Sequence, residues 1–163
     1  MTLPSRQHPR LKNYDYGQCG CYHVTICVKN RRPILSTILP ARIESQRASI
    51  QLQKAGYVAQ HFILNIPLVY AGVLVEHSVI MPNHIHILLR LTAESTTTIP
   101  TIIRSFKRMT TRELGVSIWQ DSYYDVIIRN DSMFQSEWNY IDCNPDKWAE
   151  DPLYVTDLQT SRR

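Results

Sequence analysis

The stretch IMPNHIHILLRL, residues 80–91, contains a Pro82–Asn83 step followed by the run HIHILLRL, which is typical of a β-strand. Successive side chains of a strand point to opposite faces of the sheet. We therefore expect His84 and His86 to project from one face, while Ile85 between them points into apolar packing on the other. The sequence on either side of this strand supplies the other elements of an α+β domain.

Apolar patterns predict further strands over residues 22–29, 68–75 and 124–129, and helices over residues 41–60 and 99–114. Residues Asn130 to Ser132 offer caps for a last helix, and Ser132 with Gln135 fits a capping box. This helix ends at about Cys143, because the residue before Pro145 disfavours helical backbone. The order strand, helix, strand, strand, helix, strand is that of a ferredoxin-like split βαβ fold with an antiparallel sheet. We expect the C-terminal helix to lie across this sheet.

The length of 163 residues favours one domain, and a content of 44% hydrophobic and 20% charged residues indicates a globular chain. We expect a flexible arm over residues 1–15, a single domain over 16–155 and a flexible tail over 156–163. No apolar stretch approaches the roughly 18 residues of a membrane span, and the N-terminus lacks the apolar core of a signal peptide. These features, with four cysteines that form no secreted disulfide framework, predict a cytoplasmic protein without membrane contact.

Basic residues gather in two places on a chain whose net charge is +4. Arg31 and Arg32 are adjacent, and Arg104, Lys107 and Arg108 lie on one broad face of the helix predicted over residues 99–114. Such a face can contact a phosphate backbone, but it is also typical of a helix surface that only faces water. The charge pattern permits a nucleic-acid partner without establishing one.

His84 and His86 form half of a candidate metal site, because neutral imidazoles bind several divalent metals. Tyr140 and Asn144 are four residues apart near the end of the last helix and so share a face. The Asn144 amide oxygen could supply a third ligand, and a phenol beside the metal could attack as a phenolate. The alternatives are two histidines exposed on a solvated sheet face and a half-buried tyrosine whose hydroxyl only reaches water.

Four motifs, taken together and in this order, resemble the single-tyrosine transposases of the HUH class, and most of all their REP-associated branch. They are MPNHIHILL at 81–89, IIRSFKRMTTREL at 102–114, WQDSYYDVIIRN at 119–130 and YIDCNPDKWAEDP at 140–152. The earlier run YHVTICVKNRRPIL, residues 22–35, is similar to the first strand of that family and the basic turn after it. The resemblance spans residues 20–153, and its specificity lies in the combination of motifs.

The resemblance implies a DNA transposase and single-strand endonuclease that cleaves and rejoins DNA. His84, His86 and Asn144 would bind Mg²⁺ or Mn²⁺, and Tyr140 would attack a DNA phosphate to give a 5′-phosphotyrosine intermediate and a free 3′-hydroxyl. The substrate would be single-stranded DNA beside a hairpin, and the protein would be a nucleoid-associated monomer or homodimer. The backbone contacts would come from Arg31, Arg32, Arg104, Lys107 and Arg108.

Two positions depart from the family pattern. Relatives commonly carry histidine after the YYD step, where this chain has Val126, and many have Asn-Asn-Pro where this chain has Cys143-Asn144-Pro145. The second change keeps the predicted ligand. Two alternatives stay open: a domesticated hairpin-DNA-binding protein without transposition activity, and a small metal hydrolase that uses water and leaves Tyr140 without a role. The aromatic residues near the third motif are interpreted either as core or as stacking partners for unpaired bases: Trp119, Tyr123, Tyr124.

Overall fold

A computed structural model of the chain describes residues 11–155, and its centre is a four-stranded antiparallel sheet with the strand order β4-β5-β1-β6. The elements are β1 (Gly20–Cys27), β2 (Ser36–Leu39), β3 (Ser49–Leu52), α1 (Lys54–Val69), β4 (Val73–Ile80), β5 (His84–Leu91), α2 (Ile99–Leu114), β6 (Tyr124–Ile128) and α3 (Asp131–Cys143). Short 3-10 turns lie at Lys29–Arg31 and Trp148–Glu150. In this order an antiparallel strand separates the two strands of each βαβ unit, so the predicted ferredoxin-like fold is confirmed.

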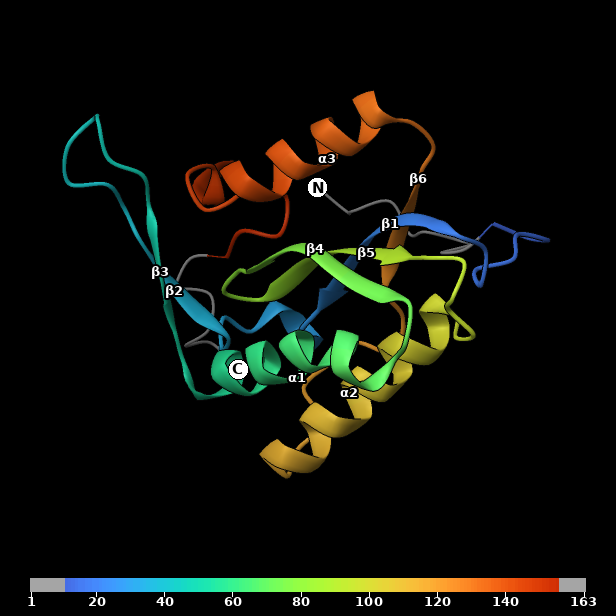
Figure 1. Cartoon of the computed structure of the whole chain (residues 1–163). Helices are drawn as coiled ribbons and strands as arrows, with labels where there is room; N and C mark the ends of the chain where they lie inside the picture. Colours follow the sequence, from blue (N-terminus) through green and yellow to red (C-terminus); the bar gives the residue numbers. More distant parts are fainter. Residues whose placement is uncertain (1–10, 156–163) are drawn as a thin grey trace.

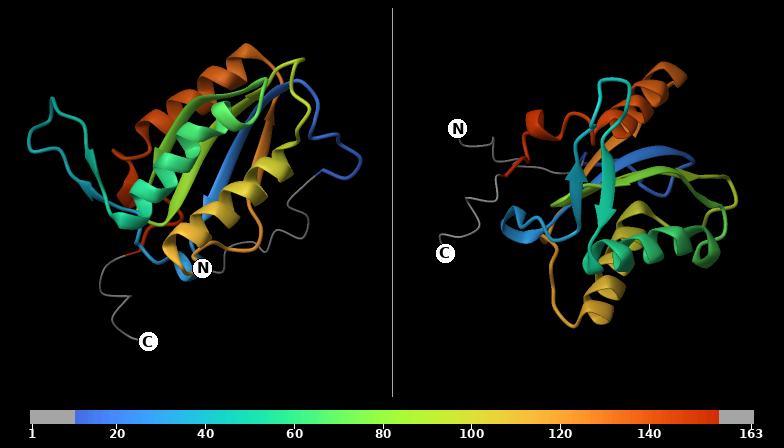
Figure 2. Two further views of the ribbon diagram at one scale, coloured as in Figure 1. Left: turned by 60° about the horizontal axis from the view of Figure 1, so that its bottom comes forward. Right: turned by 90° about the vertical axis from the view of Figure 1, so that its left-hand side faces the viewer.

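The sheet separates two layers of helices. Helices α1 and α2 cover one face, and α3 lies across the other (Figure 1). The β2–β3 hairpin extends beside the sheet near the C-terminal end of α3 (Figure 2). Residues 1–10 of the predicted arm lie outside the described residues, and so does the whole of the predicted tail. Within residues 11–155, no helix is both long and apolar enough to cross a membrane.

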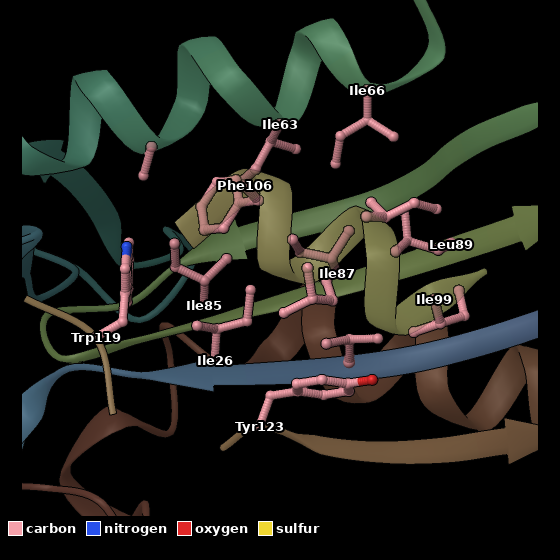
Figure 3. Close-up of a cluster of buried hydrophobic side chains, with 14 of the residues drawn as sticks. Ile26, Ile63, Ile66, Ile85, Ile87, Leu89, Ile99, Phe106, Trp119 and Tyr123 are labelled. Atoms are coloured by element: carbon pink, nitrogen blue, oxygen red, sulfur yellow. The ribbon is translucent and has the colours of Figure 1, made fainter. Parts of the chain in front are cut away.

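Strand β5 gives its two faces different residues. Ile85, Ile87 and Leu89 point toward α1 and α2, where they pack with Ile63 and Phe106 in the main core (Figure 3). Because side chains alternate along a strand, His84 and His86 face α3 instead. On that side a smaller apolar cluster fills the remaining space: Cys21, Val79, Met81, Leu88, Ile141.

Trp119 and Tyr123 belong to the main core and are 3% and 4% exposed. The Trp119 indole Nε1 donates a 2.6 Å hydrogen bond to the Thr110 hydroxyl, so its one polar group is paired. Neither ring can stack on a base without leaving the core. Of the three aromatic residues, Tyr124 is the exposed one.

The predicted start of α3 within residues 130–132 is confirmed, but the predicted capping box is wrong. Helix α3 is capped by Asn130, whose side-chain oxygen accepts a 2.8 Å hydrogen bond from the Met133 amide. Gln135 does not reach back to close a capping box; its amide donates to Asn139 one turn further on. Asn130 takes the cap position because its backbone is extended, whereas Ser132 lies inside the helix.

The bounds of the helix predicted over residues 41–60 are also wrong. Residues 36–52 form the β2–β3 hairpin, and α1 begins only at Lys54. Contacts far away in the sequence hold the hairpin tip: Asp146 accepts hydrogen bonds from the Arg47 guanidinium and the Ala48 amide. Likewise Leu68 and Val69 end α1, and β4 starts at Val73 after Gly72 turns the chain with a φ of +71°.

Candidate active site

Two buried histidines lie at the centre of the α3-covered face. His84 and His86 are 0% and 4% exposed, so the alternative of two solvated histidines does not describe this sheet. Their Nε2 atoms are 3.1 Å apart. Strand β1 is the antiparallel neighbour of β5 and places Thr25 opposite His86, with its hydroxyl 3.0 Å from His86 Nδ1.

The side chain of Asn83 orients His84. Its Nδ2 donates to the backbone oxygens of Arg31 and Leu153, at 3.2 and 2.7 Å, which turns its Oδ1 toward His84 Nδ1 at 2.9 Å. Because that oxygen can only accept, His84 Nδ1 carries the proton. The Nε2 lone pair of His84 therefore points toward His86.

Helix α3 brings Tyr140 and Asn144 to the histidines. The Tyr140 ring lies 5.4 Å from the His86 ring, centroid to centroid, at 79°, and the residue is 49% exposed. Asn144, the C-cap of α3, is 5% exposed and interacts with both Tyr140 and His84. The structure thus brings together all four residues that the sequence selected for chemistry.

Asp151 joins this group from the segment that follows α3. The chain turns back after Pro145, and Asp151 Oδ2 comes within 3.7 Å of His84 Nε2 with the side chain 4% exposed. One ligand atom from each of His84, His86 and Asp151 lies within 4.8 Å of the others. Nothing in the local sequence around Asp151 indicated this position, since it depends on how the chain folds back after the helix.

The donor set fits a divalent metal. Two ligand atoms that are each about 2.1 Å from an ion and at right angles lie about 3 Å apart, close to the 3.1 Å between the two Nε2 atoms. Asn144 Oδ1 is buried and has no hydrogen-bond partner among residues 11–155, which is costly unless another ligand satisfies it. His84, His86 and Asp151, with Asn144 beside them, can therefore hold a metal.

Burial sets the charge of these groups. It lowers the pKa of His84, although Asp151 and Asn144 partly raise it. Burial also lowers the pKa of His86 well below its ordinary value, and the neighbouring His84 and His23 lower it further. Both imidazoles are therefore neutral at pH 7, which is the form that binds metals.

The Tyr140 phenol is in an environment that disfavours its anion. Burial raises the pKa of Tyr140, as do the carboxylates of Asp151 and Glu137, and the Asn144 side chain offsets this only in part. Tyr140 borders a cavity of about 380 Å³, which Asn144 and Asp151 also line. The cavity walls carry polar and charged groups from α3 and the segment after it: Ser136, Asn139, Cys143, Asn144, Lys147, Glu150, Asp151.

Comparisons with known proteins show which sequences and solved structures this chain resembles. No family model matches the chain. An uncharacterized protein of Haemophilus influenzae is 29% identical over 175 residues, which cover 92% of this chain and 93% of that protein. A solved structure of a REP-associated tyrosine transposase bound to a REP hairpin aligns with a TM-score of 0.62 and 19% identity, over 94% of this chain and 86% of that one. This chain shares the transposase fold.

A second solved structure agrees with the first. A putative transposase from Deinococcus radiodurans R1 aligns with a TM-score of 0.50 and 18% identity, over 82% of this chain and 95% of that one. The resemblance predicted from the four motifs is therefore confirmed for the fold.

The predicted DNA-binding residues fall into two groups on the transposase fold. Arg31 and Arg32 lie at the end of the 3-10 turn after β1, and the Arg31 carbonyl is bound by Asn83 beside His84. Arg104, Lys107 and Arg108 lie on α2, on the opposite side of the sheet from Tyr140 (Figure 1). The Lys107 amine donates to the Gln120 and Ser122 carbonyls at 2.7 and 2.8 Å, so it anchors a loop.

His23 on β1 is a further residue of this face whose position the strand alternation indicates. Side-chain alternation puts Tyr22, Val24 and Ile26 on the core face of β1 and places His23 and Thr25 on the other face, beside His86. His23 Nε2 is 2.9 Å from His86 Nδ1. The cross-strand partner of His23 on β6 is Val126, the position where relatives commonly carry histidine. The imidazole on this face therefore comes from β1 and not from β6.

Proposed function

We propose that the protein is a metal-dependent DNA transposase that cleaves and rejoins single-stranded DNA through Tyr140. The observation that carries this proposal is the convergence of His84, His86, Asn144 and Tyr140 on one face of the sheet, where Tyr140 and Asn144 also line a cavity. A metal hydrolase using water would leave the half-exposed phenol beside the metal ligands without a role.

In the proposed reaction the Tyr140 hydroxyl oxygen attacks a DNA phosphorus. A phosphorus–oxygen bond to the tyrosine forms, the bond to the 3′-oxygen breaks, and that oxygen leaves as a 3′-hydroxyl after taking up a proton. The 5′-phosphotyrosine ester conserves the energy of the phosphodiester, so attack by a 3′-hydroxyl on it rejoins a strand and frees the tyrosine. Strand exchange then needs no external energy source.

His84, His86 and Asn144 are the proposed metal ligands, and Asp151 is a fourth candidate that we add from the structure. A bound Mg²⁺ or Mn²⁺ supplies Lewis-acid stabilisation of charge on the phosphate and favours the phenolate of Tyr140. Asn83 holds the His84 lone pair toward the site, and Asn144 contacts both His84 and Tyr140. These residues place ligand and nucleophile together before DNA arrives.

The proposed substrate is DNA with a hairpin next to a single-stranded segment, which the fold shared with a REP-hairpin-bound transposase supports. Arg31 and Arg32, near the metal ligands, are the proposed backbone contacts to the cleaved strand. Arg104 and Arg108 on α2 could contact only DNA that reaches the other face. A DNA substrate implies a cytoplasmic, nucleoid-associated protein, and a single chain supplies all the proposed site residues, which favours a monomer over a homodimer.

The test uses labelled hairpin oligonucleotides from the flanks of the gene, incubated with protein and manganese and resolved on a denaturing gel. The expected result is a protein–DNA adduct that disappears with chelator and with Tyr140→Phe. Tyr57→Phe is the matched control, because Tyr57 is exposed on α1, across the sheet from the site. An adduct that survives Tyr140→Phe would refute the nucleophile, and binding without any adduct would favour the domesticated hairpin-binding protein.

A further inference from the structure

A chain of hydrogen bonds joins α3 to His86 through a residue that the proposed reaction does not use. His23 on β1 lies between them: its Nδ1 is 2.5 Å from Glu137 Oε2, and its Nε2 is 2.9 Å from His86 Nδ1. The His23 side chain is 6% exposed and that of Glu137 is 22% exposed. Three elements distant in sequence therefore meet in one short polar connection.

The direction of these hydrogen bonds follows from the groups involved. A carboxylate only accepts, so His23 Nδ1 donates to Glu137 and, in a neutral ring, His23 Nε2 is left as an acceptor. That acceptor faces His86 Nδ1, which is then the protonated nitrogen of His86. The lone pair of His86 is left on Nε2, 3.1 Å from His84 Nε2.

The same orientation arises independently on His84. Asn83 fixes the proton of His84 on Nδ1, and the Glu137–His23 pair fixes the proton of His86 on its own Nδ1. Both Nε2 lone pairs consequently point to the same place. Metal-binding histidines commonly donate their other nitrogen to a carboxylate or carbonyl, and here His23 extends that connection by one imidazole.

We propose that His23 and Glu137 are a positioning pair, which selects the metal-binding tautomer of His86 and ties the helix of the nucleophile to that ligand. This inference rests on the proposed metal site. Glu137 precedes Tyr140 by three residues on α3, so the two side chains lie on the same side of the helix. The His23 ring is 5.9 Å from the Tyr140 ring and 5.0 Å from the His86 ring, centroid to centroid, and so lies against both.

A second acceptor makes the contribution of the pair measurable. The Thr25 hydroxyl is 3.0 Å from His86 Nδ1 and can accept its proton when His23 is changed. We therefore expect weaker metal binding and not its complete loss. Removal of such outer contacts typically raises the dissociation constant for the metal about 10- to 100-fold.

The first measurement is Mn²⁺ affinity without DNA, followed by the electron paramagnetic resonance signal of free manganese. The variants are Glu137→Gln, Glu137→Ala and His23→Ala, and Glu113→Gln on α2 is the matched control for loss of a carboxylate. Glu113→Gln should leave the manganese affinity unchanged. Glu137→Gln should lower it less than Glu137→Ala, which should lower it at least tenfold. Adduct formation by Glu137→Gln should recover at saturating manganese, because ligand orientation and not the nucleophile is impaired.

Folded Glu137→Ala or His23→Ala protein that binds manganese with wild-type affinity would overturn the proposal, and so would an equal loss in Glu113→Gln. Circular dichroism establishes folding, and if His23→Ala does not fold, Glu137→Ala decides the question alone, because it removes the acceptor of His23 Nδ1 at a partly exposed position. The outcome is separable from that of the proposed function. Absence of any adduct from wild-type protein would refute DNA cleavage, whereas the affinity series is measured without DNA and would still test the positioning pair.

Discussion

One buried amide, that of Asn83, determines which nitrogen of His84 faces the candidate metal site. Replacing it by alanine removes three hydrogen bonds, to the carbonyls of Arg31 and Leu153 and to His84 Nδ1. Asn83 is 1% exposed, so water does not readily replace these bonds. At about 1 kcal/mol each, their loss lowers the free energy of unfolding by about 3 kcal/mol. The His84 ring loses its fixed tautomer, and we expect Mn²⁺ affinity to fall about 10- to 100-fold.

Two measurements on Asn83→Ala separate these effects. Urea unfolding in chelator, followed by tryptophan fluorescence, reports stability without bound metal, and calorimetric titration of manganese reports affinity. The control is Asn65→Ala, because the Asn65 amide pairs with His61 in an exposed hydrogen bond on α1, and its loss should change stability by less than about 0.5 kcal/mol. A destabilised Asn83→Ala protein that binds manganese normally would refute the orienting role, and unchanged stability would refute the hydrogen bonds themselves.

Three further predictions concern other parts of the molecule. Burial raises the pKa of Cys27 to about 11, so at pH 8 only about one thiol in a thousand is ionised; exposed Cys19 should react quickly with a disulfide reagent and Cys27 only after unfolding, and equal rates would contradict the packing of β1. Arg47→Ala removes the ion pairs to Asp142 and Asp146, and amide hydrogen exchange should quicken in β2 and β3 but not in β5, a uniform change being the contrary result. Lys107→Met should lower the melting temperature while the exposed neighbour variant Arg108→Met leaves it unchanged, because the Lys107 amine holds the carbonyls of residues 120–122.

The sheet and its main layers could be predicted from the sequence because their signals are local. The apolar alternation of β1 and β5 and the apolar face of α2 reflect which side of each element is buried, and burial leaves a direct mark on composition. The separation of His84 and His86 from Ile85 follows from the same rule. Tyr140 and Asn144 were found together because helical spacing relates residues three or four apart.

The elements that could not be predicted from the sequence are fixed by contacts between residues far apart along the chain. The β2–β3 hairpin has short, partly exposed strands and is held at its tip by Arg47, Ala48 and Asp146, about a hundred residues apart in the chain. Asp151 reaches His84 only because the segment after α3 turns back over the sheet. The tie between His23 and Glu137 likewise joins residues that no periodicity relates, although the face of β1 that bears His23 was readable.

The alternation of side chains along β5 also means that the pairing register of this strand decides whether the candidate site forms. A slip of one residue in its pairing with β1 would turn His84 and His86 toward Ile63 and Phe106, and would turn Ile85 and Ile87 toward α3. Such a register would bury two imidazoles among hydrocarbons without partners and is strongly disfavoured. Misregistered chains should therefore be removed as unfolded protein and not persist as folded but inactive molecules. If the candidate site binds a metal as proposed, every folded chain in a preparation should bind one equivalent, so the fraction of competent sites should equal the fraction of folded protein.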